Sequence, residues 1–79
     1  MNIEYDKNKL GVYIVDTIIA PLMLRTKPDS SGTVLTQMAK NSEVVCYGCY
    51  SGSWIEVIYC NGETVFEGFA HTDYLTRKS

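Results

Sequence analysis

The sequence predicts a small all-β domain, either a barrel or a sandwich. Short segments rich in Val, Ile, Thr and Tyr recur along the 79 residues, and turn residues separate them at intervals of roughly 8 to 12 positions. No stretch shows a sustained helical repeat of apolar residues. The length and a hydrophobic content of 46% fit one compact domain. A closed barrel would also hide the edges of so short a sheet.

The expected strands are defined by residues that suit a pleated, half-buried surface and by the turns between them. Leu22 and Leu24 alternate with Met23 and Arg25, which predicts a strand with one buried face. We expect Arg25 to pair with a carboxylate or carbonyl and so stabilise the long loop from Thr26 to Thr33. The expected strands are Val12–Ile19, Leu22–Arg25, Val34–Met38, Glu43–Tyr47, Tyr47–Tyr50, Trp54–Tyr59 and Val65–His71.

Turn residues connect these strands. Ser51 to Ser53 indicates a hairpin, and Asn61-Gly62 indicates a tight primed turn. Thr72 to Tyr74 is expected to form a single helical turn. Residues 1–11 have little apolar content and are expected to form a loosely ordered leader or linker. The expected domain covers residues 12–77.

Four segments carry a more specific pattern. Leu22 to Pro28 has the form Leu-x-Val-Arg-x-x-Pro with Leu24 in place of Val, and Val34 to Met38 is a short apolar stretch. Trp54 to Val57 is a Trp-x-x-Val strand, and Gly68 to Leu75 closes with Gly-aromatic-small and Tyr-Leu. In order and spacing these segments resemble the bacterial Src-homology-3-like (SH3b) family, over about residues 12–76.

The resemblance implies an SH3-like barrel of about five to seven short antiparallel strands with a short 3-10 turn near the C-terminus. It also implies a non-catalytic module that binds a short peptide or a peptidoglycan cross-bridge. Two positions depart from the family pattern, since Asn41 replaces a usual Gly and Phe69 replaces a usual Trp or Tyr. Asn also tolerates a left-handed backbone, so we expect the turn at Asn41 to survive.

Composition excludes several function classes. The formal net charge of −2, with no basic stripe, argues against nucleic-acid binding. No apolar run is long enough to span a membrane, and the N-terminus lacks the pattern of a secretory signal. An odd number of cysteines excludes a fully paired disulfide framework within one chain. We expect a cytoplasmic protein if the chain is complete, and a surface or secreted one if it is part of a larger protein.

The cysteines and the single histidine could suggest a metal site or a nucleophile. Cys46 and Cys49 are three residues apart, which on a strand places them on opposite faces, and Cys46 is in phase with the apolar Val44. A nucleophilic pair of His71 with Cys46, Cys49 or Cys60 would need a cleft and an oxyanion site, which a small barrel hardly provides. We therefore expect no enzyme activity, no cofactor and no metal.

The aromatic residues are the strongest indication of a ligand surface. Rings combine a large contact area with a polar tip, and exposed rings near loop ends favour contact with a partner. Trp54 and Tyr74 could instead close the core, and Asp29 could merely bond its own backbone. We expect the ligand to lie between the loop from Thr26 to Thr33 and an aromatic patch that includes Tyr50, Trp54 and Tyr74. The predicted ligand residues are Asp29, Ser30, Tyr47, Tyr50, Trp54 and Tyr74.

Two other functions stay open. One is a small intracellular protein, of phage or mobile-element origin, that binds or inhibits a protein partner. The other is a structural spacer or a barrel that dimerises through its first strand. The expected partner is a peptide, a cell-wall peptide or a protein, and we expect a monomer rather than a dimer.

Overall fold

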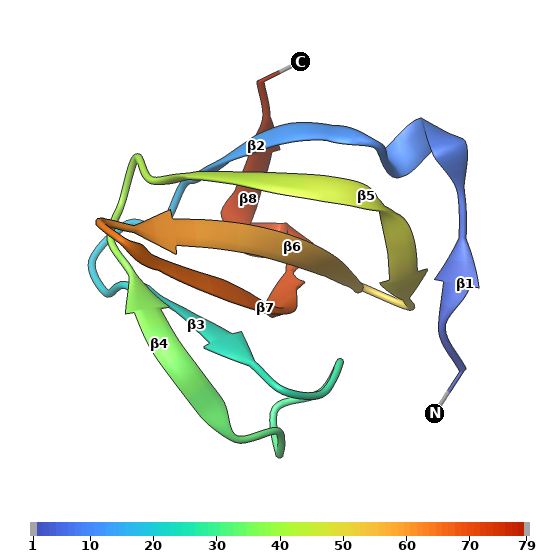
Figure 1. Cartoon of the computed structure of the whole chain (residues 1–79), viewed down its shortest axis with the longest axis horizontal. Helices are drawn as coiled ribbons and strands as arrows, with labels where there is room; N and C mark the ends of the chain where they lie inside the picture. The colour runs from blue at the N-terminus through green and yellow to red at the C-terminus, as the bar shows by residue number, and fades with distance from the viewer. Residues whose placement is uncertain (1, 79) are drawn as a thin grey trace.

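The computed structural model describes residues 2–78, in which eight strands form a single antiparallel sheet (Figure 1). The sheet order is β4-β3-β7-β6-β5-β2-β8, and β1 pairs with β5 outside this path. The strands are β1 (Glu4–Tyr5), β2 (Gly11–Val15), β3 (Leu22–Arg25), β4 (Val34–Met38), β5 (Glu43–Ser51), β6 (Trp54–Asn61), β7 (Thr64–His71) and β8 (Leu75–Arg77). Two 3-10 helices are η1 (Lys7–Lys9) and η2 (Thr72–Tyr74).

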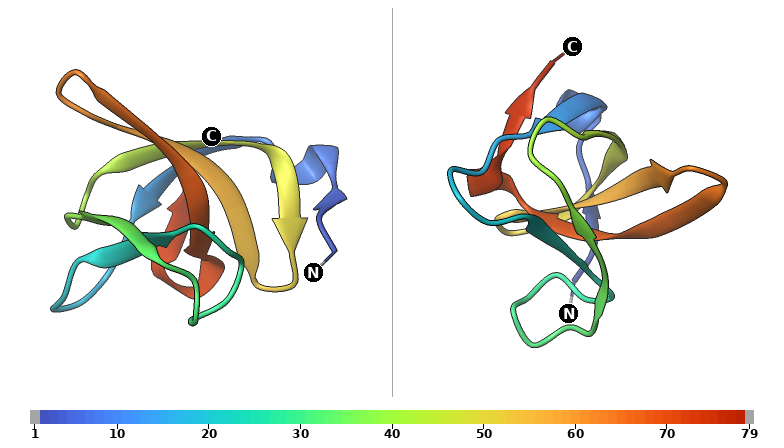
Figure 2. Two further views of the ribbon diagram at one scale, coloured as in Figure 1. Left: turned by 60° about the horizontal axis from the view of Figure 1, so that its bottom comes forward. Right: turned by 90° about the vertical axis from the view of Figure 1, so that its left-hand side faces the viewer.

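The sheet curls on itself, and the β6–β7 hairpin projects from one side (Figure 2). The predicted all-β, SH3-like barrel with a 3-10 turn near the C-terminus is confirmed. Within residues 2–78 the eight strands exceed the five to seven expected. The two residues of β1 and the three of β8 are too short to show apolar alternation in the sequence.

Alternation along the strands builds the core. In β6 the side chains of Ile55, Val57 and Tyr59 are buried, whereas the residues between them are not. Successive strand residues point to opposite faces, so one face of β6 lines the interior. Leu24 in β3 contributes in the same way. The full core cluster is Val15, Leu22, Leu24, Met38, Val44, Cys46, Ile55, Val57, Tyr59 and Ala70.

The strand predicted over Val12–Ile19 is wrong in its second half, because β2 ends at Val15. Beyond it the Asp16 amide donates to the Tyr74 carbonyl over 2.8 Å, which directs the chain toward η2 rather than along the sheet. Ile18 and Ile19 are 93% and 96% exposed. β-Branched composition favoured a strand here, but no neighbouring strand pairs with these residues.

The N-terminal segment contacts the barrel. Tyr5 pairs with Cys49, and η1 is capped by the Asp6 carboxylate, which accepts from the Asn8 amide over 2.9 Å. The Arg77 guanidinium donates to the carbonyls of Asn8 and Leu10. Residue 1 lies outside the described residues. A domain that spans residues 12–77 stays a prediction.

The turns follow glycine and asparagine chemistry. Gly52 and Gly62 have φ of 57° and 63°. Each is the first of the two turn residues in its hairpin, as in type II′ turns. The turn predicted at Asn61-Gly62 is therefore placed at Gly62 and Glu63, since Asn61 still pairs with Thr64. Asn41 has a φ of 75°, which confirms the expected left-handed conformation.

Candidate ligand-binding site

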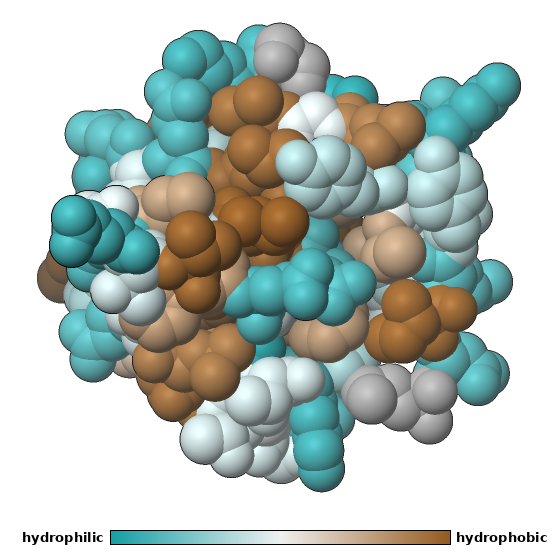
Figure 3. Space-filling model, viewed as in Figure 1, coloured by the Kyte–Doolittle hydropathy of each residue, from teal (hydrophilic) through white to brown (hydrophobic). Residues whose placement is uncertain are grey.

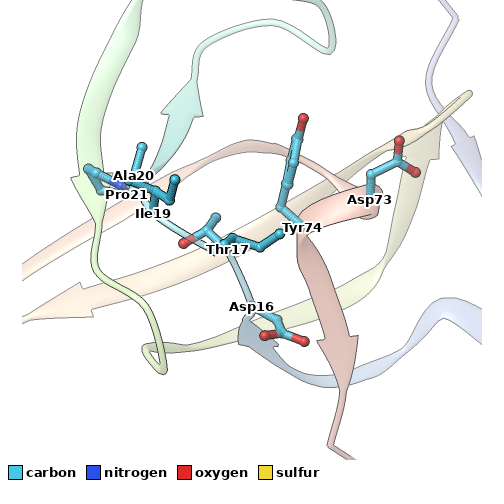
Figure 4. A pocket seen from close by; sticks show the side chains of 8 residues that line it. Asp16, Thr17, Ile19, Ala20, Pro21, Asp73 and Tyr74 are labelled. Atoms are coloured by element: carbon cyan, nitrogen blue, oxygen red, sulfur yellow. The ribbon is translucent and has the colours of Figure 1, made fainter.

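A surface groove lies between the loop that follows β2 and the helix η2. It has a volume of about 540 Å³ and is lined by residues 16–21 together with Asp73 and Tyr74. Figure 4 shows the Tyr74 ring standing between Ile19 on one side and Asp73 on the other. The Tyr74 side chain is about half exposed, at 49% for the residue. An aromatic ring with a polar tip is thus available on the wall of the groove.

The loop of residues 16–21 is held at its base by three polar contacts. The Lys40 ammonium donates to the Thr17 carbonyl over 2.7 Å and lies 3.2 Å from the Asp16 carboxylate. The Thr76 hydroxyl donates to the other Asp16 oxygen over 2.9 Å. These bonds from Thr76 and Lys40 lower the pKa of Asp16. These contacts therefore anchor the start of the groove loop, at Asp16 and Thr17.

Ile18 and Ile19 form an apolar ridge on this loop. A second groove of about 430 Å³ lies on the other side of the ridge, where Gln37, Ala39 and Lys40 complete its lining. Because both side chains are nearly fully exposed, contact with a partner would remove their apolar area from water. Ile18 and Ile19 are the most exposed large apolar side chains among residues 2–78.

Three rings form a row that ends at the first groove. Trp54 and His71 are directly opposite in β6 and β7, with ring centroids 5.1 Å apart. His71 lies 5.7 Å from Tyr74. The Nδ1 atom of His71 accepts from the Asp73 amide over 3.1 Å, which caps η2 and fixes the ring. We call Trp54, His71 and Tyr74 the aromatic row.

The structure brings two of the predicted aromatic residues together and separates the others. Tyr74 and Trp54 both belong to the aromatic row, whereas Tyr50 lies opposite Ile55 and packs against the core. Because neighbours on a strand point to opposite faces, Trp54 projects away from the side that carries Tyr50. The Lys9 ammonium covers the Tyr50 ring at 4.6 Å. A single patch of Tyr50, Trp54 and Tyr74 does not form.

The remaining predicted residues lie elsewhere. Tyr47 is 62% exposed on β5, on the outer side of the sheet. Asp29 accepts from the Ser31 amide over 2.8 Å, and these bonds from Ser31 lower its pKa. Ser30 is exposed in the same loop. As expected, Arg25 stabilises this loop, because its guanidinium donates to the Gly32 carbonyl over 3.0 Å.

The cysteines occupy three different environments. Cys46 is buried in the core, as its phase with Val44 predicted, and burial raises the pKa of its thiol. Cys49 is half-buried and Cys60 is exposed. Between Asn2 and Lys78, no three His, Cys, Asp or Glu side chains gather closely enough to hold a metal ion. In the same stretch no helix is long and apolar enough to cross a membrane.

Sequence reasoning missed the Ile18–Ile19 ridge and His71. Asp16 was the available signal for the ridge, because Asp is depleted in strands and interrupts the run from Val12. The sequence suggested His71 only as a metal ligand or as the partner of a cysteine nucleophile. Its place between Trp54 and Tyr74 follows from the β6–β7 register, which local sequence does not specify.

The curled antiparallel sheet and the 3-10 helix before the last strand define an SH3-like barrel with a surface groove. A family model of the bacterial SH3 domain matches residues 21–76. The chain belongs to this family, whose members are non-catalytic binding domains. Comparison with curated proteins and with solved structures gave no match.

Proposed function

We propose that this domain binds a short extended peptide, such as a peptidoglycan cross-bridge, along the groove between the Ile18–Ile19 ridge and Tyr74. The observation that carries the proposal is the exposure of the two isoleucines beside a half-exposed tyrosine on a groove of about 540 Å³. Exposed apolar side chains next to a groove mark binding surfaces. The bacterial SH3 match supports a binding role in general.

Each part of the site has a role in this proposal. The ridge buries its isoleucine side chains against the ligand, and Tyr74 contributes ring contact and a hydroxyl. Trp54 and His71 extend the contact along the aromatic row. The Asp73 carboxylate is exposed at the rim of the groove, where it can accept from a ligand amide or amine.

The size of the site favours modest affinity. A groove of this volume accommodates a few residues, which is far less than the area of a stable protein interface. Such weak contacts gain strength when several copies or tethered modules act together. Peptidoglycan is a repeating ligand and meets this requirement.

The proposal is tested by co-sedimentation with purified peptidoglycan sacculi. The key variant is the double substitution Ile18→Ser and Ile19→Ser, because these side chains lie outside the core and their loss leaves the fold intact. Tyr74→Ala probes the groove, and Tyr47→Ala is the matched control, since it removes another exposed tyrosine that lies outside the groove. Circular dichroism checks folding.

We expect sacculi to retain the native chain and the Tyr47 variant, and to release the ridge and Tyr74 variants. Retention of all four proteins would contradict a site at the groove. If sacculi retain none of them but a lysate protein binds through the same ridge, the alternative of a protein-partner module replaces the cell-wall ligand.

A further inference from the structure

The outer face of the sheet carries an apolar stripe away from the groove. Val12 lies opposite Val45, and Val45 lies opposite Ile58, so the three residues form a row across β2, β5 and β6. Figure 3 shows brown atoms in a band over these strands, on the face seen in Figure 1. All three side chains are partly exposed. We call this row the outer stripe.

Further apolar residues share this face. Ile14 follows Val12 by two positions, and Val65 lies opposite Cys60 at the far end of the β6–β7 pair. Val65 is 65% exposed and Tyr47 is 62% exposed. Residues two apart on a strand point to the same side, so these side chains continue the outer stripe rather than the core. The apolar side chains on this face therefore extend from β2 to β7.

Two carboxylates border the stripe without a cation. Glu67 lies opposite Ile58, and Glu56 is two residues from Ile58 on the same side of β6. Burial raises the pKa of Glu56, and the nearby Glu67 adds to the shift. In residues 2–78 neither carboxylate forms an ion pair, whereas Glu43 on the same sheet lies 2.7 Å from the Lys78 ammonium.

We propose that this face docks a protein segment that carries a Lys or Arg among apolar side chains. The cation lies against Glu56 and Glu67, and the apolar side chains cover the outer stripe. Charge complementarity supports this occupant, since a cation would relieve the repulsion between the two carboxylates, of which Glu56 is partly desolvated. A second copy docked face to face would add carboxylates instead of cations.

This surface is separate from the proposed peptide groove. The outer stripe lies on β2, β5 and β6, whereas the groove is formed by residues 16–21 and η2. A substitution on one surface therefore leaves the other intact. Either proposal can fail without the other.

The test uses a fluorescein-labelled synthetic peptide of alternating Lys and Leu, with binding to the native chain measured by fluorescence anisotropy. The double variant Glu56→Gln with Glu67→Gln removes the two carboxylates and should not unfold the domain, because it relieves repulsion. Glu4→Gln with Glu63→Gln is the matched control, since it changes the net charge equally at exposed positions away from the stripe. Ile58→Ser tests the apolar contact.

We expect the Glu56/Glu67 variant to bind roughly five- to tenfold more weakly than the native chain, as for two partly exposed ion pairs. The Glu4/Glu63 variant and Tyr74→Ala should bind as the native chain does. Equal weakening by both double variants would show a general charge attraction and overturn the proposal. Sedimentation of the native chain as a dimer that Ile58→Ser dissociates would also overturn it, in favour of a second copy.

Discussion

Trp54 and His71 contact each other edge to face across the β6–β7 pair, with ring centroids 5.1 Å apart and ring planes at 77°. This geometry places the positive edge of one ring against the face of the other. Because His71 also contacts Tyr74, the pair connects the end of the hairpin to the groove. The contact is therefore part of both the stability of the domain and the shape of its site.

A double-mutant cycle measures this contact. Trp54→Ala and His71→Ala should show a coupling of about 0.5–1.5 kcal/mol in the free energy of unfolding. The cycle cancels the separate loss of the η2 cap in the His71 variant. Urea unfolding followed by circular dichroism gives the values. A control cycle of Trp54→Ala with Val65→Ala, at opposite ends of β6 and β7, should be additive, and additivity in both cycles would rule out the contact.

Gly48 allows the N-terminal segment to lie against β5. Its φ is 105°, and a Cβ atom there would lie 2.6 Å from the Tyr5 ring. Gly48→Ala should therefore lose at least about 1–3 kcal/mol of unfolding free energy. Gly52→Ala, at a φ of 57° with no neighbour within 4 Å, should lose only about 1 kcal/mol. Chemical denaturation compares them, and equal losses would contradict the close approach of Tyr5.

The ion pair at the base of the groove loop makes stability depend on pH. Hydrogen bonds from Thr76 and Lys40 lower the pKa of Asp16 below its ordinary value of 3.8. The stabilisation is therefore complete above pH 3.8 and is lost as the pH falls through the lower pKa of the folded state. Thermal unfolding across this range should show Asp16→Asn less stable at neutral pH and the difference vanishing in acid. A constant difference at every pH would contradict this.

The three thiols should react at different rates. Cys60 is exposed and should react with an aromatic disulfide reagent first, whereas Cys46 is buried and its raised pKa leaves little thiolate. Cys60→Ser should remove the fast phase, and urea should make the remaining thiols react together. Fast reaction of Cys46 in the native state would contradict its place in the core.

The sequence predicted the fold because its strands carry clear alternation. Ile55, Val57 and Tyr59 alternate with more exposed residues in β6, and all three are buried. Asn41 adopts the left-handed conformation expected of its turn. The strand over Val12–Ile19 was too long, because residue preference does not reveal that no neighbouring strand pairs with Ile18 and Ile19.

The site was harder to predict because it depends on which face each residue occupies. Tyr50 and Trp54 are close in sequence, yet the β5–β6 register places Tyr50 on the core side with Ile55. A shift of one residue in register would reverse this arrangement. Tyr74 lies at the groove, and its function there stays a prediction.

The most direct test of the central claim is a titration of the ¹⁵N-labelled domain with soluble peptides released from peptidoglycan by enzymatic digestion. We predict amide shift changes concentrated in residues 16–21 and 71–74, and their loss in the Ile18→Ser/Ile19→Ser variant. Shift changes confined to other regions, or unchanged binding by that variant, would contradict a peptide site at the groove.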